Sequence, residues 1–437
     1  MKRFLNKSLF LKNVSILMSG TVIAQLLTVA ISPILTRIYG PEAFGILAIY
    51  TSIVSILSVI VTGRYELAIV IPKNNKDAMN LLYLSCLIVT VVSLVTFIVM
   101  LVFNDLLSSI LNFNQVNYMF FYVPLSIFLL GIYQSCSYWS TRKKQFKRLS
   151  ISQVLRSTSV NGTQVSGGVM NFGGIGLIGG QILGQLVATA TMVYQLFKED
   201  RSEFVKNKNF GQAKRLLKEY KDFPIYSSGQ AFVNSISQNM MPFILLFFFN
   251  PVVVGYYALS LRLLQMPVNL VGNSVKQVFY QRASEEINNN EDISNIFLKT
   301  TLLLAAISFL PAIIIIICSP YAFSFFLGET WYQGGIYARW VVIWLFFFFI
   351  ARPAITIFQI YRKQAIFLLY EVIAIIIKVA ILLLVSILEN DIYTIIAFSI
   401  VNSLHYIFLI IVVTKIIKKN HIGKESEHEK EICTTSS

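Results

Sequence analysis

The chain has 437 residues, of which 56% are hydrophobic and 13% are charged, and its formal net charge is +15. Soluble proteins carry about 25% charged residues, so this composition excludes a soluble globular domain. The long apolar runs are continuous rather than alternating, which excludes a transmembrane β-barrel and predicts an all-α polytopic membrane protein. At about 20 residues a span, the chain accommodates about twelve transmembrane helices.

The apolar runs place the spans along the chain. The first six are predicted at Val14–Thr36, Phe44–Gly63, Met79–Phe103, Tyr118–Thr141, Leu149–Met170 and Ile175–Phe197. The next six are predicted at Phe223–Asn250, Val252–Tyr280, Phe297–Phe323, Ile336–Ile360, Ile366–Leu388 and Ile392–Thr414. Half of Leu149–Met170 is polar, so we expect this helix to face a water-filled cavity.

Positive charge alternates along the loops between these spans. Basic residues crowd the segment before the first span and the segment 198–221, whereas the loops 104–117, 319–335 and 389–391 contain no Lys or Arg. This positive-inside pattern predicts cytoplasmic N- and C-termini. The basic charge therefore reports topology and does not indicate a nucleic-acid partner.

A pattern of residue types occurs twice. The first copy contains Ser19-Gly20, Gln25, Pro33, Pro41, Gly45 and Ala48. The second copy contains Ser228-Gly229, Asn234, Pro242, Pro251, Gly255 and Ala258. The spacing predicts two parallel six-helix bundles, 1–197 and 223–414, joined by a basic cytoplasmic linker, 198–222, and followed by a disordered tail, 415–437. Pro33 and Pro242 are predicted hinges, although a simple helix-end role is the alternative.

Several segments resemble a known family. They are Ser19-Gly20, Pro33-Ile34-Leu35-Thr36-Arg37, Tyr39-Gly40-Pro41-Glu42-Ala43-Phe44-Gly45, Arg64-Tyr65-Glu66-Leu67-Ala68, Gly176-Leu177-Ile178, Gly180-Gln181 and Gly184-Gln185. Together they resemble Wzx-type polysaccharide flippases of O-antigen or capsule synthesis, in the multidrug/oligosaccharidyl-lipid/polysaccharide exporter (MOP) superfamily. In the second half of the chain, only the topology and the repeat pattern support this resemblance.

The resemblance implies a fold and an activity. The fold would be two six-helix bundles that form a V around a central cationic cavity in the inner membrane of a bacterium. The activity would be transfer of an undecaprenyl-pyrophosphate-linked oligosaccharide from the cytoplasmic to the periplasmic leaflet by alternating access, with no cofactor and no enzymatic reaction. The product would be O-antigen of lipopolysaccharide, capsule or exopolysaccharide. A polysaccharide polymerase and a chain-length regulator would be the expected protein partners.

Basic residues inside the predicted spans are candidate functional residues, because charge at membrane depth is unfavourable. Arg156 and Arg262 are predicted to bind the pyrophosphate, and Lys378 is a further candidate whose alternative role is to extend a polar stripe. Gln25 and Asn234 are predicted to line the cavity, with hydrogen bonding between helices as the alternative.

Two charge pairs are predicted. Arg352 and Glu371 have matching depth on neighbouring antiparallel spans, which favours a structural ion pair. The repeat offset of 210 relates Glu66 to Lys276, and we expect an inner gate in which they pair. Two solvated interfacial charges are the alternative for the second pair.

Other motifs favour no chemistry. Gly174-x-Gly176-x-x-Gly179 matches a dinucleotide fingerprint but follows no strand, and Gly176, Gly180 and Gly184 instead form a ladder for close helix packing. Neither the scattered cysteines nor the histidines predict a metal site. No Walker motif is present.

Two other functions are alternatives. A cation-coupled multidrug antiporter needs an embedded carboxylate, and the first span has no Asp or Glu. A glycan polymerase or ligase usually carries a large periplasmic loop, whereas 319–335 is the longest predicted here. The flippase is therefore the favoured function.

Overall fold

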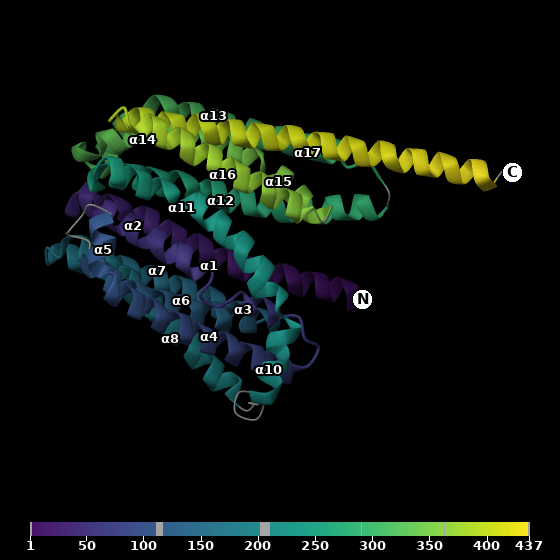
Figure 1. Ribbon diagram of the computed structural model, residues 1–437, viewed down its shortest axis with the longest axis horizontal. Helices are drawn as coiled ribbons and strands as arrows, with labels where there is room; N and C mark the ends of the chain where they lie inside the picture. Colours follow the sequence, from purple (N-terminus) through teal and green to yellow (C-terminus); the bar gives the residue numbers. More distant parts are fainter. Residues whose placement is uncertain (1, 111–116, 202–209, 290, 362, 436–437) are drawn as a thin grey trace. The chain divides into compact units, whose positions relative to one another are not determined.

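The computed structural model describes residues 2–110, 117–201, 210–289, 291–361 and 363–435, and these form helices and connecting turns (Figure 1). The first helices are α1 (Lys2–Ile38), α2 (Pro41–Ser58), α3 (Tyr65–Ala68), α4 (Asn75–Val102), α5 (Asn104–Ile110), α6 (Asn117–Arg142), α7 (Phe146–Val169), α8 (Gly173–Glu199) and α10 (Phe210–Glu219). A π-helical turn, Phe223–Ser227, leads into α11 (Ser228–Phe248), α12 (Pro251–Asn288) and α13 (Ser294–Leu327). A 3-10 turn, Glu329–Trp331, precedes α14 (Tyr332–Ile350), α15 (Arg352–Ile360), α16 (Gln364–Ser386) and α17 (Asp391–Thr435).

The protein is a multi-pass membrane protein. Among the described residues, ten helices are long and apolar enough to cross a membrane. The predicted fifth and eighth spans correspond to the helices α7 and α12, which are outside those ten because of their polar residues. Their insertion, and with it the total of twelve spans, stays a prediction.

One predicted span and the predicted tail differ from the structure. The tenth span, Ile336–Ile360, consists of two helices, α14 and α15, and the turn at Ala351 precedes Pro353, which has no N–H to donate. The tail after Thr414, predicted to be disordered, continues α17 to Thr435. Its Lys and Glu residues have high helix propensity, which accounts for the continued helix.

The chain divides into two compact units. Unit 1 contains Met1–Ala258 and Phe326–Thr330, and unit 2 contains Leu259–Phe325 and Trp331–Ser437. The division therefore falls within α12 rather than in the predicted linker, 198–222, whose residues 202–209 are outside the described part. The remaining part of this linker includes the whole of α10, which packs against α4 in unit 1.

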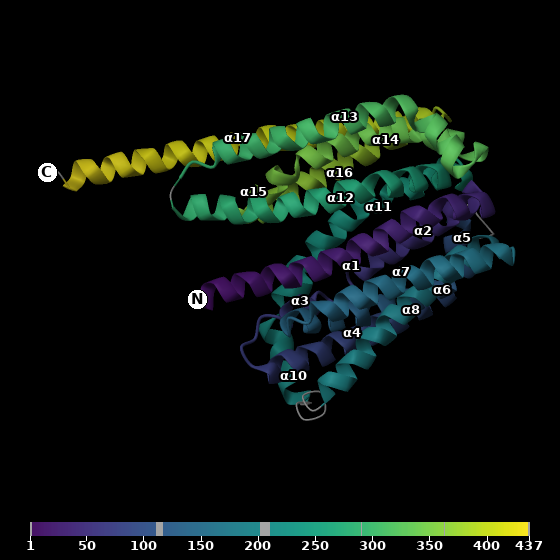
Figure 2. The same cartoon turned by 180° about the vertical axis from the view of Figure 1, so that it is seen from behind.

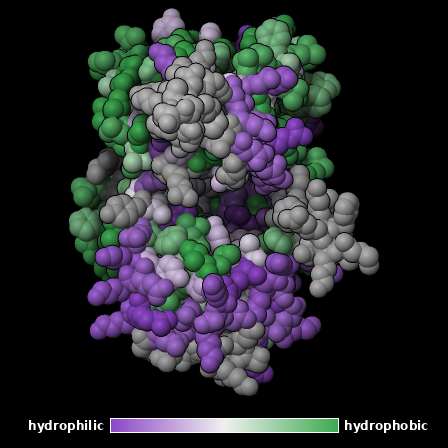
Figure 3. Space-filling model, turned by 90° about the vertical axis from the view of Figure 1, so that its right-hand side faces the viewer, coloured by the Kyte–Doolittle hydropathy of each residue, from purple (hydrophilic) through white to green (hydrophobic). Residues whose placement is uncertain are grey.

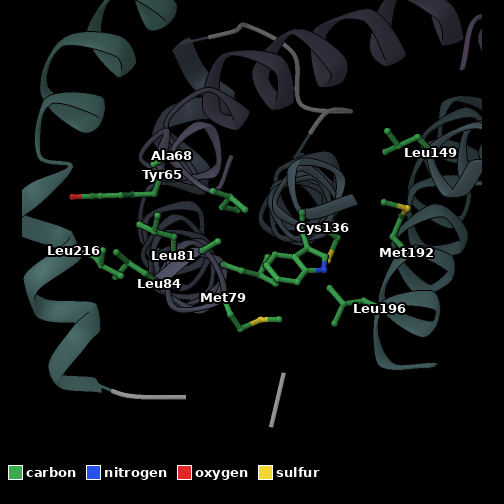
Figure 4. Packing of buried hydrophobic residues seen from close by; sticks show 14 residues of the cluster. Tyr65, Ala68, Met79, Leu81, Leu84, Cys136, Leu149, Met192, Leu196 and Leu216 are labelled. Atoms are coloured by element: carbon green, nitrogen blue, oxygen red, sulfur yellow. The ribbon is translucent and has the colours of Figure 1, made fainter. Parts of the chain in front are cut away.

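The core of unit 1 explains why α10 belongs to it. Leu216 of α10 reaches toward Leu81 and Leu84 of α4 within a cluster of buried residues (Figure 4). Arg215 Nη2 also lies 3.0 Å from Asp77 Oδ1. Hydrophilic side chains gather at the end of this unit where α10 lies (Figure 3). That this end is cytoplasmic stays a prediction.

Unit 1 also shows a reciprocal contact between the two sequence repeats. A Cβ atom added to Gly45 would lie 2.8 Å from the carbonyl carbon of Pro251, and one added to Gly255 would lie 2.7 Å from that of Pro41. Gly45 contacts Pro251 in the same way as Gly255 contacts Pro41, and these are equivalent positions of the two repeats. The beginnings of α2 and α12 cross with their backbones in contact, as only glycine permits.

Unit 2 is built around α15 and α17. Buried residues of α12, α13, α15 and α17 form one cluster that includes Phe279, Phe297, Phe358 and Leu409. The helices α14, α16 and α17 lie side by side in both ribbon views (Figures 1 and 2). This packing places the first residue of α15, Arg352, beside α12.

Candidate substrate-contact residues

The polar residues of α7 largely serve helix packing. Thr21 Oγ1 of α1 donates a hydrogen bond to Gln153 Oε1 (2.7 Å), and Gln164 Nε2 donates to the carbonyl oxygen of Leu177 in α8 (3.0 Å). The expectation that the polar side of this helix faces water is therefore wrong for Gln164, which is buried. Its amide N–H group bonds to the neighbouring helix instead.

The glycines of α8 bring its backbone against α7. A Cβ atom on Gly180 would lie 3.0 Å from the carbonyl oxygen of Val160, and one on Gly184 would lie 3.1 Å from the amide nitrogen of Val160. Gly176 lies against Gly167 in the same way, at 3.2 Å from its carbonyl carbon. The three glycines thus form a continuous packing face.

Arg156 is the exception among the polar residues of α7. Its side chain is half-buried, and no described residue forms a hydrogen bond or an ion pair with it. Tyr133 of α6 is close enough for an electrostatic interaction but carries no charge to neutralise the guanidinium. Arg156 therefore remains a candidate for binding an anion.

The amide residues predicted to line a cavity have different surroundings. Gln25 of α1 is half-buried, and no described residue hydrogen-bonds to its side chain. Asn234 of α11 accepts a hydrogen bond of 2.7 Å from Gln238 Nε2, one turn along the same helix. This bond occupies only part of the capacity of the Asn234 amide, so both residues stay available to a ligand.

The two prolines lie inside continuous helices. Pro33 is part of α1, where Thr36 Oγ1 donates to its carbonyl oxygen (3.2 Å). Pro242 is buried inside α11. Hinge motion at these prolines stays a prediction.

Glu66 is a buried carboxylate at the end of unit 1. It is 2% exposed, and its Oε1 lies 3.8 Å from Nη1 of Arg64, which has a left-handed backbone (φ 59°). Burial raises the pKa of Glu66, while a hydrogen bond with Thr62 and the charge of Arg64 oppose that shift. The gate predicted with Lys276 would require Glu66 to exchange its Arg64 partner.

The predicted pair of Arg352 and Glu371 is not formed. Arg352 Nη2 donates to Asn269 Oδ1 (2.7 Å) and Nη1 to Asn273 Oδ1 (3.5 Å), both on α12. Glu371 Oε1 instead lies 3.6 Å from His405 Nε2 of α17. The two side chains point to different neighbouring helices.

Lys378 lies in the same region of unit 2. It is 3% exposed, and its Nζ is 5.9 Å from the ring centroid of Tyr406. Glu371 interacts electrostatically with it. Lys378 is thus enclosed by aromatic and acidic groups of its own unit, which favours the polar-stripe alternative over direct ligand contact.

The helix α12 carries a polar face that the sequence analysis recognised only at its ends. Arg262, Asn269 and Lys276 follow one another at intervals of seven residues, and Asn273 lies one turn from Asn269. Such spacings bring side chains to one helix face. Arg262 is half-buried, and no described residue forms a hydrogen bond or an ion pair with it. The heptad spacing would have identified Asn269, and the spacing of one helical turn would have identified Asn273.

No metal centre is indicated in the described part of the chain, where no three His, Cys, Asp or Glu residues gather. A family model described as polysaccharide biosynthesis protein matches residues 34–334. No curated protein sequence matches the chain.

The fold resembles that of solved transporters. A multidrug resistance MATE family transporter of the MOP superfamily, in an inward-facing conformation, has a TM-score of 0.71 at 14% identity, with 93% of this chain and 98% of that chain covered. The lipid II flippase MurJ, in an inward closed conformation, has a TM-score of 0.71 at 12% identity, with 93% and 90% covered. A MOP superfamily transporter from Pyrococcus furiosus has a TM-score of 0.57 at 13% identity, with 93% and 96% covered. The chain therefore has the fold of the MOP superfamily.

Proposed function

Because the chain belongs to the polysaccharide biosynthesis protein family, we propose that it is a flippase for lipid-linked glycans. Its substrate would be an undecaprenyl-pyrophosphate-linked oligosaccharide, moved from the cytoplasmic to the periplasmic leaflet of a bacterial inner membrane. The fold shared with a lipid II flippase supports this proposal. The glycan would serve O-antigen, capsule or exopolysaccharide synthesis.

The observation that carries the proposal is the presence of unneutralised arginines in the transmembrane region. Arg156 in unit 1 and Arg262 in unit 2 have no ion-pair partner among the described residues. An unpaired arginine at the centre of a membrane costs at least about 2.5–3.5 kcal/mol, so its retention suggests a ligand. A guanidinium group binds two phosphate oxygens at once, which suits a pyrophosphate.

The mechanism requires binding and movement but no covalent chemistry. Each arginine would replace water around the charged pyrophosphate, so that this group crosses without meeting hydrocarbon. Amides such as that of Gln25 would hydrogen-bond to sugar hydroxyl groups. The undecaprenyl chain would remain in the lipid, because moving it into a polar site would lose its apolar burial.

The test combines a gene deletion with fractionation of its lipid-linked oligosaccharides. The proposal predicts loss of surface glycan and accumulation of the complete lipid-linked unit on the cytoplasmic leaflet. Accumulation on the periplasmic leaflet would refute flipping and indicate a polymerase or ligase. Complementation with Arg156→Gln and Arg262→Gln should fail, whereas Arg142→Gln, which removes a cytoplasmic-end arginine bonded to loop carbonyls, should restore the glycan.

A multidrug antiporter is the second candidate. One observation favours it: Glu371 provides an embedded carboxylate beside a histidine, in a fold shared with a MATE transporter. The cationic side chains Arg156 and Arg262 argue against cationic drugs as cargo, because like charges repel. Normal surface glycan together with new sensitivity to cationic drugs in the deletion strain would establish this function and overturn the flippase.

A further inference from the structure

Hydrogen bonds to α12 hold the side chain of Arg352 against that helix. Its guanidinium group donates to Asn269 on one side and to Asn273 on the other. A Cβ atom on the intervening Gly272 would lie 3.1 Å from Arg352 Nε, so the glycine leaves room for the guanidinium. The ring of Phe348 lies 4.2 Å from Arg352 Cζ on another side. Four residues thus fix the position of one positive charge.

A second positive charge, that of Lys276, lies close to Arg352. Lys276 follows Asn273 by three residues and Gly272 by four, on the same face of α12. Its charge and that of Arg352 repel each other. Among the described residues, no carboxylate pairs with either group, and the residue of α17 that interacts electrostatically with Arg352 is the uncharged Tyr406.

The asparagines orient Arg352 but do not neutralise it. Arg352 Nε is buried without a hydrogen-bond partner among the described residues. An external anion would offset the repulsion between these two cations, one of which is held in place by four neighbours.

We propose that Arg352 and Lys276 form a phosphate-binding site within unit 2. This inference rests on the proposed function, in which the ligand is the pyrophosphate of a lipid-linked glycan. Arg352 would supply directional donors and Lys276 a mobile point charge, a combination suited to phosphate oxygens. The same chemistry would accept a free pyrophosphate or the phosphate of an anionic lipid headgroup.

The position of the site defines its role in transport. Lys276 is 14 residues beyond Arg262, which is about 21 Å along a straight helix. One pyrophosphate cannot contact both residues at once, so Arg262 and Lys276 belong to two successive binding sites on one face of α12. With the predicted topology, the site of Arg352 and Lys276 is the one nearer the cytoplasm.

The experiment measures ligand binding to the full-length protein in nanodiscs of neutral phosphatidylcholine. The probes are undecaprenyl pyrophosphate, inorganic pyrophosphate and, in separate nanodiscs, added phosphatidylglycerol. Arg352→Gln and Lys276→Gln should each weaken binding of undecaprenyl pyrophosphate at least tenfold. Arg282→Gln is the matched control, because Arg282 is an exposed cation on the same helix outside the site. Binding within twofold of wild type in both site variants would overturn the proposal.

The probes also distinguish the sources of phosphate. Tighter binding of undecaprenyl pyrophosphate than of inorganic pyrophosphate assigns the site to the lipid-linked substrate. Equal binding of the two assigns it to the pyrophosphate group alone. Competition by phosphatidylglycerol, lost in Arg352→Gln, assigns it to a membrane lipid and removes its role in transport.

Asn273→Asp separates a binding role from a structural one. The substitution keeps the shape of the side chain and places a carboxylate beside Arg352, so the site would receive its anion from within the chain. We expect a higher thermal midpoint and at least tenfold weaker binding of undecaprenyl pyrophosphate. A purely structural arginine would gain stability with unchanged binding, and that result would refute the site.

The binding measurements distinguish failure of this site from failure of the proposed flippase function. If Arg352→Gln and Lys276→Gln bind normally while Arg262→Gln loses binding, the flippase proposal stands and the second site fails. If wild-type protein binds none of the phosphate probes, both fail.

Discussion

The crossing of α2 and α12 offers a direct test of the repeat contact. Substituting Gly45 by alanine would put a Cβ atom 2.8 Å from the carbonyl carbon of Pro251 and 3.1 Å from the amide nitrogen of Gly255. Carbon atoms in favourable contact are about 3.5–4.0 Å apart, so the two backbones must separate by about 1 Å. No flexible side chain is available to absorb the displacement.

The expected cost follows from this geometry. Overpacking in a well-packed interior destabilises by about 1–3 kcal/mol, and a clash of backbone with backbone belongs at the upper end of that range. Gly255→Ala should cost a similar amount because its contact with Pro41 is the reciprocal one. One separation of the helices relieves both clashes, so the double variant should be destabilised by clearly less than the sum.

The assay is the thermal unfolding midpoint of purified protein in one detergent, read by loss of the monodisperse chromatographic peak. The control is Gly229→Ala, because no atom lies within 4 Å of its added Cβ and alanine favours a helix by about 0.5–1 kcal/mol. A Gly45→Ala midpoint equal to that of Gly229→Ala would refute the backbone contact. Full additivity in the double variant would refute the shared crossing.

Three further predictions concern charged residues of the predicted cytoplasmic end. Arg148→Met should destabilise the protein by about 3–5 kcal/mol, because Arg148 Nη1 lies 3.0 Å from Oδ2 of the buried Asp200, which would keep its hydrogen bond from Trp139 but lose its cationic partner. An unchanged unfolding midpoint would contradict this. The raised pKa of Glu66 means that the folded chain binds a proton more tightly than the unfolded one, so stability should fall as pH rises from the ordinary glutamate pKa to the raised one. Glu66→Gln should remove that decline in midpoints measured across this range, and a persisting decline would exclude Glu66 as its source. For the predicted gate, reversing the charge of Glu66 or Lys276 alone should abolish glycan export and reversing both should restore it, whereas failure of the rescue would argue against the pair.

The sequence predicted the helices well because hydropathy and charge asymmetry act along the chain. The positions of α4, α8 and α16 follow from apolar runs, and the repeat pattern anticipated two positions that prove to be in contact, Gly45 and Gly255. The break before Pro353 was missed because the surrounding residues remain apolar. The periodicity of α12 was present in the sequence but was used only at its two cations.

Side-chain partners were harder to predict. The sequence indicates how deep a residue lies in the membrane, but it does not indicate which neighbouring helix each helix face contacts. Arg352 and Glu371 were predicted to have similar depth, but their side chains contact α12 and α17 instead of each other. The polarity of α7 predicted water, whereas its Gln164 hydrogen-bonds to the backbone of α8. The position of a hydrogen-bond donor in the sequence does not indicate which acceptor it will contact in the fold.

The contact between Gly45 and Gly255 bears on how such a chain could arise. Each position touches the start of the other's helix, which is the reciprocity of a symmetric homodimer interface. A half-length ancestor that paired with itself would already have had this contact before its gene was duplicated and fused. Gly20 and Gly229 have since diverged in surroundings: a Cβ atom would lie 2.9 Å from Ser150 Cα at Gly20 but would meet nothing within 4 Å at Gly229. Gly45 and Gly255 cannot change in this way, because a side chain at either position would push the two helices apart.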